Sequence, residues 1–127
     1  MDLSSNGDHM RPGEIGIKDS EVLLGLLQNA FHPALRRIII DVADNFGLMM
    51  TESYRQQQHL NDLHGTAPVR AIDIRSWCYA YPNAIEKWIN DNWVYDPDRP
   101  DMKCAILHDA GSGMHFHIQV HPMTRRR

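Results

Sequence analysis

The chain has 127 residues, with 13 Lys and Arg against 16 Asp and Glu and a formal net charge of -3 at pH 7. This length suits one compact domain and is too short for two ordinary ones. The slight acidity gives no long-range field that would attract nucleic acid or an anionic membrane, so we expect neither as a partner.

The two ends of the chain show no periodic pattern. Residues 1–17 are rich in Gly, Pro and polar side chains, and we expect them to form an extended lead-in that lies over the domain. The basic run at 125–127 is expected to be a solvated, frayed tail. The ordered domain should therefore span residues 18–124.

No stretch of the sequence has the character of a targeting or membrane segment. The first twenty residues lack the apolar core of a secretory signal. No later window approaches the ~20 apolar residues of a membrane span. We therefore expect the protein to be cytoplasmic as synthesised.

Two helices are predicted in the first half of the chain. In residues 20–30 apolar side chains recur at helical spacing, and Asp19 or the serine after it can cap the first turn. Residues 33–46 carry a second apolar stripe, begin with proline and end before Gly47, which suits a left-handed helix stop. The apolar positions of the first helix are Val22, Leu23, Leu26, Leu27 and Ala30.

Four segments are predicted as strands. Residues 48–55 and 69–75 have strand character and flank a polar segment with one or two helical turns. The last two strands, 104–109 and 115–121, are joined by a glycine-containing connection that is typical of a hairpin.

A third helix is predicted after Pro82, where apolar residues again recur on one face. Asn83 and Glu86 have the spacing of a capping box at its start. Together the elements predict an α+β fold in which helices pack on a small antiparallel sheet.

The two cysteines carry no recognisable motif. Cys78 and Cys104 lie far apart and show no Cys-x-x-Cys spacing, which argues against a redox site or a cysteine zinc knuckle. We expect both to be buried thiols.

Histidine is concentrated in two windows of the sequence, residues 59–75 and 115–121. Alternate side chains of a strand share a face, so the second window separates into two sets: His115, His117, Gln119 and His121 on one face, Phe116, Ile118 and Val120 on the other. The apolar set supplies a natural core face, because buried imidazoles would need hydrogen-bond partners. The histidines should therefore line a surface or a cleft.

Two of these histidines and an aspartate form a candidate metal site. Catalytic zinc commonly has three nitrogen or oxygen ligands and keeps a fourth position for water, and His64, Asp73 and His117 would meet that need. Zinc lowers the pKa of bound water toward ~7 and polarises carbonyl groups. The pattern therefore points to hydrolysis of an amide. The same ligands would also bind other divalent ions, so the sequence does not fix the metal.

The same residues resemble the zinc peptidases of the D-alanyl-D-alanine carboxypeptidase and hedgehog amino-terminal type, which include phage endolysins that cleave peptidoglycan stem peptides. The resemblance covers most of the chain and rests on three motifs in the family's order: "SYR" at 53–55, "HGTAPVRAIDIR" at 64–75 and "HFH" at 115–117. It implies a single zinc peptidase-like domain at 18–124, with His64, Asp73 and His117 as zinc ligands and Arg55 as a substrate contact.

The spacing of the first two ligands departs from the family pattern. The family usually places its first histidine and its aspartate closer together than His64 and Asp73 are here. Either the intervening loop is longer, or another residue supplies the first ligand, for which His59 is the candidate.

The general base is the second departure. Many family members carry a glutamate three residues before the last ligand, and this chain has Met114 at that position. A base must reach the reacting water within ~3 Å or through one further water. The nearby groups are His115, His108 and Asp109, and the His-x-His pair favours His115.

The resemblance therefore implies a zinc peptidase, a carboxypeptidase or an endopeptidase, that hydrolyses an amide bond of a peptidoglycan-derived peptide, as a phage lysis enzyme does. We expect it to be a monomer. A non-catalytic zinc-binding recognition or structural module of the same fold is the alternative. A cupin is a third reading of the "HFH" segment, weakened by the strong helix at 33–46.

Overall fold

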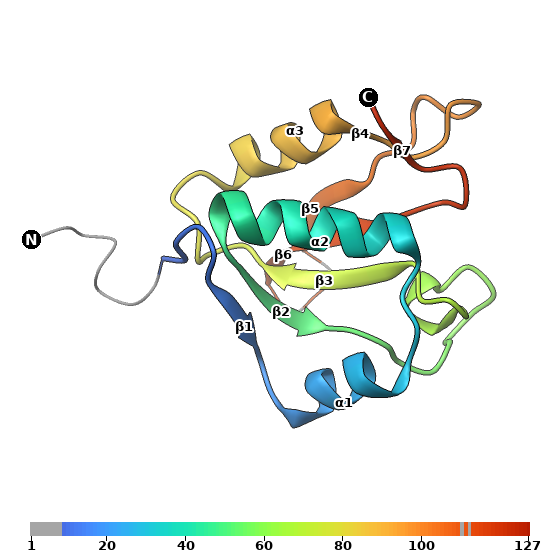
Figure 1. Cartoon of the computed structure of the whole chain (residues 1–127), viewed down its shortest axis with the longest axis horizontal. Coiled ribbons are helices and arrows are strands. Elements are labelled where there is room, and N and C mark those ends of the chain that lie inside the picture. Colours follow the sequence, from blue (N-terminus) through green and yellow to red (C-terminus); the bar gives the residue numbers. More distant parts are fainter. Residues whose placement is uncertain (1–8, 110, 112) are drawn as a thin grey trace, which may run out of the picture.

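The computed structural model describes residues 9–109, 111 and 113–127 and contains a five-stranded sheet with helices packed against it (Figure 1). The strand order is β1-β2-β3-β6-β5, in which β1 and β2 are parallel and the other neighbours are antiparallel. The strands are β1 Ile15–Ile17, β2 Leu48–Glu52, β3 Ala71–Arg75, β5 Ala105–Asp109 and β6 Met114–Gln119. The predicted α+β class is confirmed. The sheet is open, which contradicts the cupin hypothesis.

Helix α2 (Pro33–Phe46) shares the hydrophobic core with the sheet and has the predicted bounds. Its proline stands in the first turn, and the chain leaves the helix at Gly47 with φ 75°, a conformation that favours glycine. The apolar stripe of α2 packs on the side chains that alternate along the central strands. The most deeply buried of these residues are Leu35, Ile38, Val42, Ile72, Ile74, Phe116 and Ile118.

Helix α1 (Ser20–Gln28) begins as predicted, because the Asp19 carboxylate accepts a hydrogen bond from Val22 N at 3.0 Å. The expected apolar face is partly wrong, since Leu23 and Leu27 are 45% and 74% exposed. Gly25 is the cause. A Cβ on Gly25 would lie 2.2 Å from Ser53 Oγ, so the helix packs through this glycine against the end of β2.

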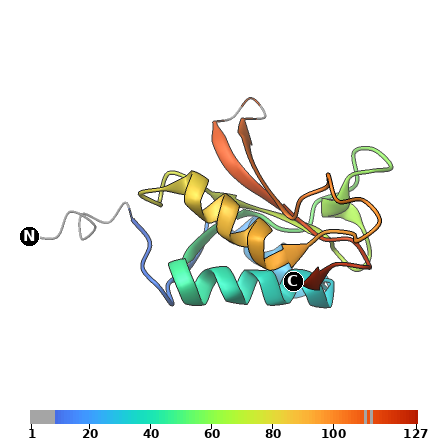
Figure 2. The ribbon, with the colours of Figure 1, turned by 90° about the horizontal axis from the view of Figure 1, so that it is seen from above.

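Helix α3 (Pro82–Asn92) lies beside α2 in both views (Figure 1 and Figure 2) and buries Ile85 and Ile89. The predicted capping box is wrong, because the helix start has no side-chain cap. The Glu86 carboxylate instead accepts a hydrogen bond from Leu107 N at 2.7 Å and ties the helix to β5. No helix in the described residues is long and apolar enough to cross a membrane.

The described parts of the two end segments are more regular than the sequence indicated. Residues 1–8 of the predicted lead-in lie outside the described residues, but Ile15–Ile17 pair with β2 as strand β1. The predicted frayed tail is wrong: β7 (Arg125–Arg126) pairs with β4 (Trp93–Val94). The guanidinium of Arg126 lies 4.5 Å from the ring centroid of Trp93, a contact that helps to hold the tail.

The two cysteines are free and buried, as predicted. Burial raises the pKa of Cys78 to about 11 and the pKa of Cys104 to about 12. Both thiols therefore stay protonated at neutral pH and belong to the core.

Candidate metal centre

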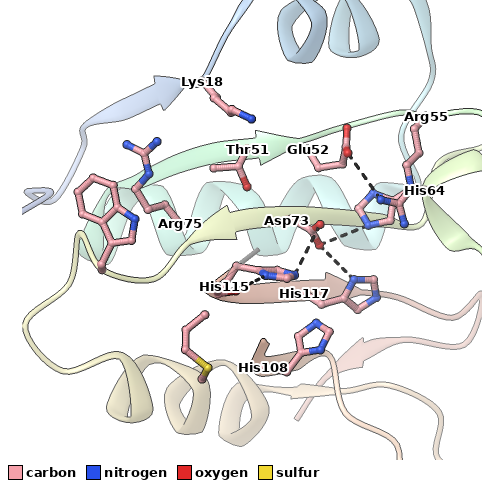
Figure 3. A pocket seen from close by; sticks show the side chains of 13 residues that line it. Lys18, Thr51, Glu52, Arg55, His64, Asp73, Arg75, His108, His115 and His117 are labelled. Atoms are coloured by element: carbon pink, nitrogen blue, oxygen red, sulfur yellow. Dashed lines mark hydrogen bonds and ion pairs between the residues drawn. The ribbon is translucent and has the colours of Figure 1, made fainter. Parts of the chain in front are cut away.

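Three side chains from the two histidine-rich windows meet on the sheet face opposite α2 (Figure 3). Asp73 on β3 and His117 on β6 are direct cross-strand partners, and His64 lies in a short 3-10 helix at Leu63–Gly65. Asp73 Oδ1 is 3.3 Å from His64 Nε2 and 3.2 Å from His117 Nδ1. One donor atom of each residue lies within 4.8 Å of the others, so all three could bind one cation.

The loop between His64 and Asp73 folds back on itself before β3 begins, and this accommodates the wide spacing of the two ligands in the sequence. The Thr66 hydroxyl lies 3.0 and 2.8 Å from the carbonyl oxygens of Leu63 and Pro68, and its single hydrogen is shared between them. The residues between the two ligands therefore form a closed turn. The wider spacing of the first two ligands does not prevent them from meeting.

His64 is positioned by a close contact between two stretches of backbone. A Cβ on Gly65 would lie 2.6 Å from Gln57 N, so only glycine allows this approach. His64 itself is 2% exposed. His59, the alternative first ligand, is exposed and does not line the site, so the structure favours His64.

The proton on the His64 ring is fixed by a backbone carbonyl. His64 Nδ1 lies 3.1 Å from Ser53 O, which can only accept, so Nδ1 carries the hydrogen and donates it. In the neutral ring Nε2 is then an unprotonated nitrogen that points at Asp73. This arrangement is the one by which protein frameworks orient a metal-binding imidazole.

His117 is oriented in the same way by Gln119. The Gln119 amide nitrogen donates to Lys103 O at 2.8 Å, which turns Gln119 Oε1 toward His117 Nε2 at 3.2 Å. His117 Nε2 therefore donates its hydrogen to Gln119, and Nδ1 of the neutral ring faces Asp73. Two nitrogen lone pairs and a carboxylate converge, and only protons or a cation can hold them together.

The electrostatics of Asp73 agree with this requirement. Burial would raise the pKa of Asp73, but hydrogen bonds from His117 and His64, which require a proton on the ring nitrogen that faces the carboxylate, outweigh burial and hold the pKa well below its usual range. The carboxylate is therefore anionic at neutral pH. Two imidazole nitrogens and one anionic oxygen are a donor set that suits zinc.

The triad opens into a cavity of about 500 Å³, large enough for a short peptide segment. Figure 3 shows the triad toward one end of this cavity, with charged side chains from β2, from β3 and from Lys18, which follows β1, along its wall. The other polar lining residues include Lys18, Glu52, Arg55, Arg75, His108 and His115.

Glu52 reaches this wall because β2 contains a bulge. Between two paired positions β2 advances from Met50 to Glu52, while β3 advances only from Ile74 to Asp73. The extra residue is Thr51, and both Thr51 and Glu52 line the cavity. Without the bulge Glu52 would face the core, so the irregularity places a carboxylate beside Asp73.

The predicted auxiliary histidines lie next to the triad. His115 Nε2 is 3.8 Å from Asp73 Oδ2, and its Nδ1 is 3.2 Å from Gly113 O. The ring of His108 lies 4.7 Å from that of His115, centroid to centroid. Burial, and then the charge of His115, lower the pKa of His108, which favours its neutral form.

Arg55 lines the cavity but is already engaged. Its Nε lies 3.4 Å from Asp62 Oδ2, and another guanidinium nitrogen lies 3.6 Å from Glu52 Oε2. Asp62 in turn accepts a hydrogen bond from His64 N at 3.2 Å. The geometry therefore places Arg55 as a support for the loop that carries His64, and it is less available as a substrate contact.

Asp109 does not take part in the site. It is exposed, and its carboxylate accepts hydrogen bonds from Gly111 N and Gly113 N at 2.7 and 3.1 Å, which lower its pKa. Its predicted catalytic role is unsupported, because it stabilises the β5–β6 connection and does not line the cavity. Ala110 and Ser112 of that connection lie outside the described residues.

Several residues of the site were not selected from the sequence, namely Lys18, Glu52, Arg75 and Gln119. Strand alternation places Arg75 on the same face as Asp73 and Gln119 on the same face as His117, so these two carried a usable signal. Glu52 depends on the bulge, and Lys18 depends on strand β1. Neither had such a signal.

Comparison of the chain with protein-family models, with curated proteins and with solved structures gives no match. Fold and site together define an α+β protein with a candidate metal centre of two histidines and one aspartate on the open face of its sheet.

Proposed function

We propose that the protein is a zinc-dependent peptidase that hydrolyses an amide bond in a peptidoglycan stem peptide. The observation that carries this proposal is the orientation of His64 and His117, whose unprotonated nitrogens face Asp73 at the end of a peptide-sized cavity. When bound, zinc would acidify a water molecule and polarise the carbonyl of the scissile amide.

The residues around the triad would supply the rest of the chemistry. His115 lies beside Asp73 and can donate a hydrogen bond to a developing oxyanion or move a proton. Among the described residues, Glu52 is the carboxylate that lines the cavity outside the triad, and it offers a proton acceptor that position 114 lacks. The peptide would lie along the wall that β2 and β3 form.

A non-catalytic zinc-binding module is the second candidate. One observation favours it: Met114, three residues before His117, is 51% exposed and cannot act as a base. In that case zinc would only join the His64 loop to the sheet, and no amide would be cleaved. The alternative keeps the metal and removes turnover, so the two candidates differ in one measurable property.

Metal content and cleavage therefore have to be measured on the same preparations. We expect one equivalent of zinc by elemental analysis, and new termini by mass spectrometry of a peptidoglycan digest. His64→Ala, Asp73→Ala and His117→Ala should each lose stoichiometric zinc. His115→Ala should keep the zinc and lose most of the rate, by roughly 100-fold or more, as expected for a positioned acid or base.

The outcomes separate the candidates. Zinc that survives all three triad substitutions would reject the metal site, and with it both candidates. Full zinc content without cleavage of any peptidoglycan fragment would support the binding module and reject the peptidase.

A further inference from the structure

One end of the cavity carries positive charge that no carboxylate of the described residues neutralises. Lys18 and Arg75 line this end, which Figure 3 shows on the side away from His64, and within the described residues neither forms an ion pair. Arg55, the third cation of the cavity, is already shared by two carboxylates. We infer that Lys18 and Arg75 bind a carboxylate of the substrate, so that the protein selects acidic peptides.

This inference rests on the proposed function for the identity of the substrate as a peptide. It also gives Arg75 a substrate contact of the kind that the resemblance implied for Arg55. A guanidinium matches a carboxylate with two parallel hydrogen bonds, provided that it is not already paired. Arg75 meets that condition within the described residues, and Arg55 does not.

The guanidinium of Arg75 is held in place by an aromatic ring. It lies 4.3 Å from the ring centroid of Trp77, whose side chain is 59% exposed and also lines the cavity. Stacking restricts the long side chain and leaves the in-plane N–H groups free for a ligand. Trp77 adds an apolar surface on which the carbon chain of an acidic residue can pack.

Lys18 is brought to the same end by the pairing of β1 with β2. Its backbone N donates to Met50 O at 2.9 Å, which continues the ladder by one residue beyond β1. The side chain then lies next to Thr51 in the bulge (Figure 3). Lys18 is solvent-exposed, so it should contribute less than Arg75 to the binding of a carboxylate.

The spacing along β3 indicates where the carboxylate lies in the substrate. Asp73 and Arg75 are two positions apart and face the same side of the sheet. At about 3.3 Å per strand residue they are separated by roughly 7 Å, the length of about two extended peptide residues. The favoured substrate therefore carries a carboxylate about two residues from the amide that lies at the metal.

The test uses the full chain loaded with one equivalent of zinc and two synthetic stem peptides. The peptides are identical except that the glutamyl α-carboxylate is free in one and converted to the amide in the other. Calorimetric titration gives the Kd of each peptide, and mass spectrometry records cleavage of both. We expect the free acid to bind about 10- to 100-fold more tightly, the range of a charge-assisted hydrogen-bonded pair.

Four variants assign the preference to this end of the cavity. Arg75→Gln should remove most of the preference for the acid, and Lys18→Gln should reduce it. Arg75→Lys keeps the charge and should retain part of it. Lys87→Gln is the matched control, because Lys87 is an exposed lysine on α3 paired with Asp91, and its preference should equal that of the wild type. Zinc content confirms that each variant is folded.

Each outcome decides the inference separately from the proposed function. Cleavage of both peptides with equal Kd would overturn the carboxylate subsite and leave the peptidase proposal standing. A preference for the acid that disappears in Arg75→Gln supports the subsite even if neither peptide is cleaved. A preference that survives in both Arg75→Gln and Lys18→Gln overturns it, because the carboxylate would then bind elsewhere, such as at the metal. Failure of both peptides to bind also overturns it.

Discussion

Replacing Gln119 by leucine should weaken metal binding although Gln119 never touches the metal. Its Oε1 lies 3.2 Å from His117 Nε2, and its own amide nitrogen donates to Lys103 O at 2.8 Å. Leucine removes the acceptor that keeps the hydrogen on Nε2, so His117 can adopt the other tautomer and present a protonated Nδ1 to Asp73. Loss of such an orienting partner typically costs ~10- to 100-fold in metal affinity.

The substitution should also destabilise the metal-free protein. Gln119 is 7% exposed, and leucine leaves the Lys103 carbonyl without its donor, at a cost of about 1–3 kcal/mol. At a fixed concentration of free zinc, the loss of affinity removes a further ~1.4–2.7 kcal/mol of zinc-dependent stabilisation. The gap in Tm between zinc-free and zinc-loaded protein should therefore narrow by several degrees, roughly 4 °C per kcal/mol for a domain of this size.

The assay is a zinc titration in competition with a chromophoric chelator, combined with thermal unfolding with and without zinc. Asn90→Leu is the matched control, because Asn90 makes two amide hydrogen bonds of 2.9 Å to the backbone of Ala105 and lies outside the cavity. It should lower the Tm of both forms equally and leave the zinc Kd unchanged. If Gln119→Leu behaves like Asn90→Leu, the assignment of the His117 tautomer is wrong.

Two further predictions concern the loop that carries His64. Gly65→Ala should raise the zinc Kd and lower the free energy of unfolding, measured by denaturant titration, by about 1–3 kcal/mol, because the new methyl group would lie 2.6 Å from Gln57 N. An unchanged Kd would contradict the contact. Asp62→Asn should destabilise the protein at neutral pH but not in acid. Burial would raise the pKa of Asp62, but hydrogen bonds from Gln58 N and Arg55 lower it. The contribution of Asp62 to folding stability is therefore fully present above its unfolded pKa of about 4, and it is lost as the pH falls through the lower pKa of the folded state. If the difference in free energy of unfolding between the wild type and Asp62→Asn stays the same from neutral pH into the acid range, this prediction is wrong.

Helix α2 and the three candidate ligands could be predicted from the sequence because each depends on a local signal. Helix α2 has proline at its start, glycine after its end and an apolar stripe between them, and its bounds were correct. Strand alternation placed His117 on the polar face of its strand, and Asp73 was selected by its ligand chemistry and by the motif of the resemblance. The two meet because the pairing of β3 with β6 is regular over five consecutive pairs.

The features that escaped prediction depend on contacts between distant segments. Glu52 faces the cavity only because of the bulge in β2, and a bulge changes the side of the sheet that a residue faces without an obvious mark in the sequence. The exposed leucines of α1 have the same origin, since the spacing of apolar residues cannot show that Gly25 is the point of contact. Strand β1 is only three residues long and parallel to β2, so it had no alternation to detect.

The three candidate ligands differ in how firmly the fold holds them. Asp73 and His117 are cross-strand partners in the middle of the sheet, above a core that includes Ile72 and Phe116. Their relative position is therefore set by backbone pairing, and it should persist as long as the sheet is folded. His64 instead depends on a loop that is held by the close approach of Gly65 and by the hydrogen bonds of Asp62.

A site assembled in this way should fail in two distinguishable manners. Changes in the loop should weaken metal binding while the sheet stays folded, because they displace one ligand of three. Changes in the core under β3 and β6, such as Ile72→Ala, should abolish metal binding and folding together, since removal of a fully buried isoleucine costs about 2–5 kcal/mol. If metal binding and folded structure are always lost together, even in Gly65→Ala and Asp62→Asn, then the loop and the sheet form one cooperative unit. The three ligands would in that case be held equally firmly.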